Sequence, residues 1–130
     1  MSHLGRPEEN NSFQEEFSLS PVVKELESLL DKKIPLHSLD EFENLSHIPE
    51  ISVIENTRFC IGEKTNDTDL SKRLASLADL VVMDAFATSH RAHASTTGVI
   101  TFSSDACAGL LLDEELNALS KVKEESKNSV

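Results

Sequence analysis

The sequence contains neither tryptophan nor tyrosine, and phenylalanine is present only six times. Few bulky side chains are therefore available to anchor an interior, and we expect the core to be built from aliphatic residues. At 130 residues the chain has the length of one domain with one modest core.

Basic residues are also scarce. Lysine and arginine together number 12 against 23 aspartate and glutamate residues, which gives a formal net charge of −11. A surface this acidic argues against nucleic acid or an anionic membrane as a partner that covers a broad face of the protein. An anionic ligand would need a local basic pocket.

Only two cysteines, Cys60 and Cys107, are present, and they do not form a CxxC pair. We expect both to be reduced thiols. No apolar run approaches the roughly 18 residues of a membrane span, and "MSHLGRPEENN" has neither the basic start nor the apolar stretch of a secretory signal. These features predict a cytoplasmic chain that is neither inserted into a membrane nor exported.

Apolar periodicity divides the chain into alternating elements. Helices are predicted in "SPVVKELESLLDKK", with Ser20 as N-cap and Pro21 as first helical residue, and in "DLSKRLASLADL", capped by Asp67 or Thr68. A last helix is predicted in "ACAGLLLDEELNALSKV". The predicted strands are "IPLHSL", "ISVIENTRF", "LVVMDAF" and "GVITF", and "DEFENLSHIPE" is interpreted as a loop or frayed turn.

This alternation predicts an α/β fold, with a parallel sheet covered by helices on both faces in a Rossmann-like, three-layer arrangement. In such sheets ligands bind beyond the carboxyl ends of the strands. The segments "NTRF" and "DAFATSHRAHAST" fall there.

Three of the four arginines stand where a ligand could reach them. Arg6 follows a glycine, Arg58 follows a predicted strand and Arg91 lies in the loop after another strand, whereas Arg73 is interpreted as a solvated residue on a helix face. Arginine donates two parallel hydrogen bonds to a phosphate or carboxylate. A single loop arginine more often forms a surface ion pair, but three at equivalent strand ends predict an anion pocket.

Two histidines adjoin these arginines. His3 and His90 would add hydrogen-bond donors, which become stronger on protonation near the ordinary histidine pKa of about 6.5. A metal site made by His90, His93 and Cys60 is not favoured, because no second cysteine and no HExxH pattern accompanies them. GxSxG, GxxxxGK[ST] and GxGxxG are missing as well, so the residues alone indicate an α/β domain that captures a small phosphorylated or carboxylated anion.

A family resemblance extends this interpretation. The segments "SHLGRP", "FSLSPVVKEL", "ENTRF", "GEKTND", "LASLADLVVMDAFATSHRAHAST" and "ACAGLLLDEEL" follow one another across residues 1–122. In this order they resemble the amino-terminal, substrate-binding domain of phosphoglycerate kinase, in its bacterial form. The resemblance implies an incomplete amino-terminal domain in residues 1–122 and a polar, frayed tail in residues 123–130, ahead of a nucleotide-binding domain that this sequence does not contain.

The resemblance also implies a function. Members of the family transfer a phosphoryl group between Mg-ATP and 3-phosphoglycerate, which gives 1,3-bisphosphoglycerate and ADP when two domains close over both substrates. They are usually monomeric, and the ATP and Mg²⁺ sites lie outside the part matched here. The residues implied to hold the phosphate or carboxylate of 3-phosphoglycerate are His3, Leu4, Gly5, Arg6, Arg58, His90 and Arg91.

Two family motifs are missing from the sequence, an upstream "RxDxN" and a downstream "GGAKV". We therefore expect Met1 to correspond to an internal methionine of the family, strand edges and apolar helix faces to be exposed, and the isolated chain to have no kinase turnover. Two alternatives stay open: a catalytically inactive anion-binding module, and a gene remnant.

Overall fold

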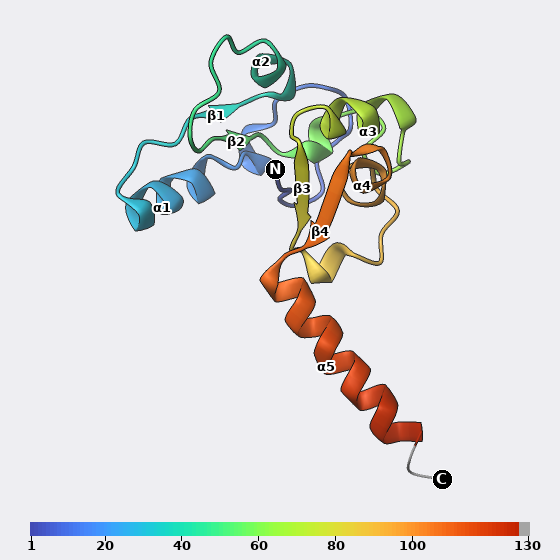
Figure 1. Ribbon diagram of the computed structural model, residues 1–130. Coiled ribbons are helices and arrows are strands. Elements are labelled where there is room, and N and C mark those ends of the chain that lie inside the picture. Colours follow the sequence, from blue (N-terminus) through green and yellow to red (C-terminus); the bar gives the residue numbers. More distant parts are fainter. Residues whose placement is uncertain (128–130) are drawn as a thin grey trace.

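The computed structural model describes the backbone of residues 1–127 and the side chains of residues 1–122. Its strands form two parallel pairs, which Figure 1 shows as two small sheets. One pair joins β1 (Leu36–His37) to β2 (Val53–Ile54), and the other joins β3 (Leu80–Met83) to β4 (Asp105–Ala108). The expected α/β class with parallel strands is confirmed, although within the described residues the strands form two pairs and not one continuous sheet.

Five α-helices are described: α1 (Ser20–Leu30), α2 (Leu39–Glu43), α3 (Thr68–Ala75), α4 (Val99–Phe102) and α5 (Leu110–Lys127). Short 3-10 helices occupy Glu15–Phe17, Thr57–Phe59 and Phe86–Thr88, and a π-helical turn spans Ala94–Gly98. In Figure 1, α3 and α4 lie close to the β3–β4 pair, whereas α5 projects away from the rest of the chain.

Two expectations about helix starts need correction. The helix predicted at Ser20 exists, but Ser20 is its first residue and Leu19 is the N-cap; the backbone N–H of Ser20 donates to Ser18 Oγ at 3.1 Å. The segment interpreted as a loop contains α2, because Ser38 and Glu41 form a capping box in which each side chain bonds the backbone N–H of the other.

The expected order of elements after residue 98 is also wrong in part. "GVITF" is not a strand: Val99–Phe102 continues the preceding π-helical turn as α4. The strand lies further on, at Asp105–Ala108, where the last helix was expected to begin, and it pairs in register with Leu80–Met83.

The last helix itself is confirmed, and its backbone continues to Lys127. The helix therefore includes much of the segment expected to be a frayed tail, and residues 128–130 of that segment lie outside the described residues. The domain boundary after residue 122 stays a prediction. Within residues 1–127, no helix combines the length and the apolar character that a membrane crossing requires.

The main core is aliphatic, as expected. It joins α2, β2, α3, β3 and the segment from the π-helical turn into α4, through the buried residues Leu39, Ile54, Leu70, Leu74, Ala75, Val81, Ala94 and Val99. Apolar side chains also remain in contact with solvent, because Leu80 and Val82 on β3 are each about half exposed. Because the core includes residues of β2 and β3, it holds in place the ends of these two strands, which carry the candidate site.

Candidate anion-binding site

The first arm of the site follows β2. Residues 55–59 are all buried, and Asn56 organises them. Its Nδ2 donates to the carbonyl oxygens of Leu4 at 2.7 Å and Phe17 at 2.9 Å, while its Oδ1 accepts from the backbone N–H of Arg58 at 3.1 Å. Asn56 therefore starts the 3-10 turn that carries Arg58 and ties this turn to the amino-terminal segment.

The "HLGRP" segment is fastened to the same turn. Arg58 Nη1 donates to the carbonyl oxygen of Gly5 at 2.6 Å, and the backbone N–H of Thr57 donates to that of Ser2 at 3.1 Å. Gly5 has a φ of +62°, a conformation that favours glycine. The carbonyl groups of Leu4 and Gly5 are thus used to position the segment beside Arg58.

Arg58 is a buried cation whose hydrogen bonds are incomplete. The residue is only 5% exposed, and its Nε has no partner among the described residues. Burial lowers the pKa of Arg58, and the charges of Arg91 and Arg6 lower it further, while Glu63 and Glu9 act in the opposite direction. A buried guanidinium with a free donor and cationic neighbours favours the binding of an anion.

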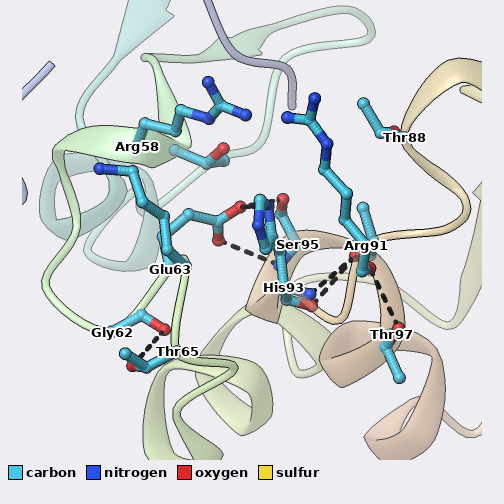
Figure 2. Close-up of polar contacts among 12 residues, drawn as sticks. Arg58, Gly62, Glu63, Thr65, Thr88, Arg91, His93, Ser95 and Thr97 are labelled. Atoms are coloured by element: carbon cyan, nitrogen blue, oxygen red, sulfur yellow. Dashed lines mark hydrogen bonds and ion pairs between the residues drawn. The ribbon is translucent and has the colours of Figure 1, made fainter. Parts of the chain in front are cut away.

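The second arm is the loop after β3. Hydroxyl groups hold its backbone, because Thr96 Oγ1 and Thr97 Oγ1 donate to the carbonyl oxygen of Arg91 at 2.7 and 3.3 Å. In Figure 2 the guanidinium groups of Arg58 and Arg91 extend toward the same side of the cluster. The run of hydroxyl residues thus shapes the loop that presents Arg91.

Two histidines share this environment. Burial and the charges of Arg58 and Arg91 lower the pKa values of His3 and His93. Both imidazoles are therefore neutral near neutral pH in the free protein, and they have protons to gain when an anion binds. The expected role of His90 stays a prediction, and its side chain is exposed.

His93 was not among the predicted site residues, although a signal for it was present. It stands two residues after Arg91, and its backbone is extended, with φ −110° and ψ 160°. The second histidine of "HRAH" is therefore the signal that the sequence offered.

A buried carboxylate, also missed, joins the two arms. Glu63 is 1% exposed and accepts hydrogen bonds from the backbone N–H of Ser95 at 3.0 Å and from the Ser95 hydroxyl. Burial raises the pKa of Glu63, while the bonds from Ser95 lower it. Its Oε1 lies 3.9 Å from Nδ1 of His93. A single glutamate in a loop gives no sequence signal that relates it to these arginines.

Arg73 lies outside this cluster, as predicted. Its side chain is 44% exposed and pairs with Asp40 at 2.6 Å and Glu43 at 2.7 Å. It therefore provides a matched control for the arginines of the site.

A metal site is not evident in the described part of the chain. Among the described residues, no group of three or more histidine, cysteine, aspartate or glutamate side chains is arranged to hold a metal ion. The described residues therefore offer no such ligand set for a metal ion.

Comparisons with known proteins agree with the motifs. The family model described as "Phosphoglycerate kinase" matches residues 1–130. Curated phosphoglycerate kinases are similar to the chain: that of Coxiella burnetii is 50% identical over 125 residues, 95% of this chain and 32% of the relative. That of Desulfovibrio desulfuricans is 47% identical over 123 residues, 94% of this chain and 31% of the relative.

Solved structures agree as well. The phosphoglycerate kinase from Coxiella burnetii superposes with a TM-score of 0.83 and 50% identity, covering 92% of this chain and 30% of that one. The enzyme from Pyrococcus horikoshii gives a TM-score of 0.69 and 26% identity, covering 92% of this chain and 31% of that one. The chain thus spans about a third of the length of its relatives. It belongs to the phosphoglycerate kinase family.

Proposed function

We propose that this chain supplies the 3-phosphoglycerate side of a glycolytic phosphotransferase, which passes a phosphoryl group between ATP and the carboxyl group of 3-phosphoglycerate. The observation that carries the proposal is the buried side chain of Arg58, which has an unpartnered Nε and lies within the electrostatic reach of Arg91 and Arg6. The substrate carries a phosphate and a carboxylate, both of which suit arginine forks. Family membership supports the same substrate.

The residues of the chain would contribute in two ways. Arg58 and Arg91 bind and orient the anionic substrate, and the segment of His3 and Arg6 closes over it from the amino-terminal side. Positive charge fixed in advance around the migrating group also lowers the cost of the charge that develops during phosphoryl transfer. The neutral histidines would take up protons as the substrate arrives.

The nucleotide side of the reaction lies beyond this chain on our proposal. Mg-ATP would bind to a carboxy-terminal domain, and the chemistry would follow when the two domains close. We place the enzyme in the cytoplasm, and its two free cysteines suit a reducing compartment. We expect the 130-residue chain alone to bind substrate without turning it over.

Calorimetric titration with 3-phosphoglycerate tests the proposal. Replacing Arg91 with alanine removes charge-assisted hydrogen bonds, and we expect the affinity to fall by about 10-fold or more. The matched variant Arg73→Ala removes an equal charge on an exposed helix face and should bind as the unchanged protein does. Equal effects of both variants, or no binding by the unchanged protein, would contradict the proposed function.

A coupled assay with ATP separates the open alternatives. Binding without turnover fits both the proposal and an inactive anion-binding module, so the assay is repeated after adding a carboxy-terminal domain from a relative. Turnover in that mixture supports the kinase, whereas its absence, with binding intact, favours the inactive module. A gene remnant predicts neither binding nor turnover.

A further inference from the structure

Glu63 is a carboxylate inside a cluster of cations, yet nothing in the proposed chemistry uses it. It is the most buried acidic side chain of the described residues, at 1% exposure. Its own pKa is raised by burial. A carboxylate beside an anion site should weaken the binding of the anion, because it competes with the ligand for the same arginines. A different role has to offset this cost.

The contacts of Glu63 supply that role. Its carboxylate accepts from both the backbone N–H and the hydroxyl group of Ser95, and its backbone carbonyl accepts from the N–H of Ala94 at 2.9 Å. Glu63 itself belongs to the turn that follows Arg58, since its backbone N–H donates to the carbonyl oxygen of Cys60 at 3.2 Å. The residue thus bonds the start of the π-helical turn, Ala94–Gly98, to the turn after β2.

The two segments that Glu63 bonds together are those that carry Arg58 and Arg91. Within the second loop, Thr96 Oγ1 connects the π-helical turn back to the carbonyl oxygen of Arg91. The turn of Arg58 is therefore connected through Glu63 to Ser95 by hydrogen bonds, and through Thr96, the next residue along the chain, to the backbone of Arg91. Figure 2 shows the Glu63–Ser95 contact between the two arms. Without this connection, two like-charged groups would tend to separate.

We propose that Glu63 is a positioning residue, which clamps the loop of Arg91 to the turn of Arg58 and so fixes the separation of the two guanidinium groups for one small anion that carries a phosphate and a carboxylate. The inference rests on the proposed function for the identity of that anion. It assigns Glu63 no contact with substrate. Its effect is exerted through Ser95.

The direction in which a substitution changes the affinity shows whether Glu63 acts by positioning the loop or only by its charge. If Glu63 acted only through its charge, Glu63→Ala and Glu63→Gln would both strengthen binding of 3-phosphoglycerate. If it positions the loop, Glu63→Ala should weaken binding by about 10-fold, because charge-assisted hydrogen bonds are lost. Glu63→Gln retains an acceptor for the N–H of Ser95 and a donor for its hydroxyl oxygen, so it should restore the affinity.

Glu9→Gln is the matched control. Glu9 acts on the pKa of Arg58 in the same direction as Glu63, but its Oε1 accepts from the backbone N–H of Lys64 at 2.7 Å. Removing its charge should leave binding unchanged or strengthen it. Ser95→Ala, which loses the hydroxyl donor and keeps the backbone bond, should weaken binding by a smaller factor than Glu63→Ala. It also serves as the second test if Glu63→Ala fails to fold.

Amide hydrogen exchange tests the positioning role of Glu63 independently of the proposed function. The backbone N–H groups of Ala94 and Ser95 should exchange about 10-fold faster in Glu63→Ala than in the unchanged protein, with or without ligand. Failure of the unchanged protein to bind 3-phosphoglycerate would overturn the proposed function. The exchange rates would still show whether Glu63 holds the loop of Arg91 in place. Unchanged exchange at both residues, or binding as tight in Glu63→Ala as in the unchanged protein, would overturn the positioning role.

Discussion

Replacing Asn56 with alanine is the sharpest structural perturbation that the site allows. The side chain is 1% exposed and makes three hydrogen bonds, two as donor to the carbonyl oxygens of Leu4 and Phe17 and one as acceptor from the N–H of Arg58. A neutral hydrogen bond contributes about 1 kcal/mol to folding, so the loss of all three should lower the free energy of unfolding by about 3 kcal/mol. That is a large fraction of an ordinary domain's stability.

Urea unfolding followed by circular dichroism measures this change. Asn44→Ala is the matched control, because Asn44 is exposed and its Nδ2 donates only to the carbonyl oxygen of Asp40, at 2.7 Å. We expect the control to lose no more than about 0.5 kcal/mol. A loss below about 1 kcal/mol in Asn56→Ala would refute the claim that this side chain joins "HLGRP" to the turn of Arg58.

Three further outcomes follow from the structure. The pKa values of His3 and His93 are lowered in the free protein, and a bound anion favours their charged forms. Affinity for 3-phosphoglycerate should therefore rise as pH falls from about 8 to about 6, and calorimetry in different buffers should show proton uptake on binding. An affinity that does not change with pH would contradict this. Burial raises the pKa of Cys60 to about 11, so iodoacetamide at neutral pH should label the exposed Cys107 first, as mass spectrometry would show. Leu74→Ala should cost about 2–5 kcal/mol in urea unfolding, and a smaller loss would mean that the core around α3 is loosely packed.

Much of the fold could be predicted from periodicity, and the errors have physical causes. "GVITF" is a short apolar run with β-branched residues, and such a run does not distinguish a strand from one buried helical turn. The π-helical turn that precedes it carries the chain into α4. Asp105–Ala108 consists of small residues with no alternation, and only its pairing with β3 makes it a strand. By contrast, the capping box of Ser38 and Glu41 is visible in the sequence as a serine followed three residues later by a glutamate, which is a recognised start of a helix.

In the candidate site, too, some residues could be predicted from the sequence and others could not. The positions of Arg58 and Arg91 were predicted from the carboxyl ends of strands, and the structure places these residues after β2 and after β3, although the two strands belong to separate pairs. His93 and Glu63 depend on loop conformation and on contacts between residues far apart in sequence, such as the bond from Ser95 to Glu63. Such contacts leave no periodic signal. Sequence reasoning therefore found the charges of the site, and the structure was needed to find what holds them in place.

The most direct test of the account is a titration of the isotope-labelled chain with 3-phosphoglycerate, followed by amide chemical shifts. We predict saturable shifts concentrated at Arg58, at residues 91–98 and at residues 3–6, with none around Arg73. Shifts that gather elsewhere on the surface, or no saturable shift at millimolar ligand, would contradict the claim that the two strand ends and the amino-terminal segment form one anion site.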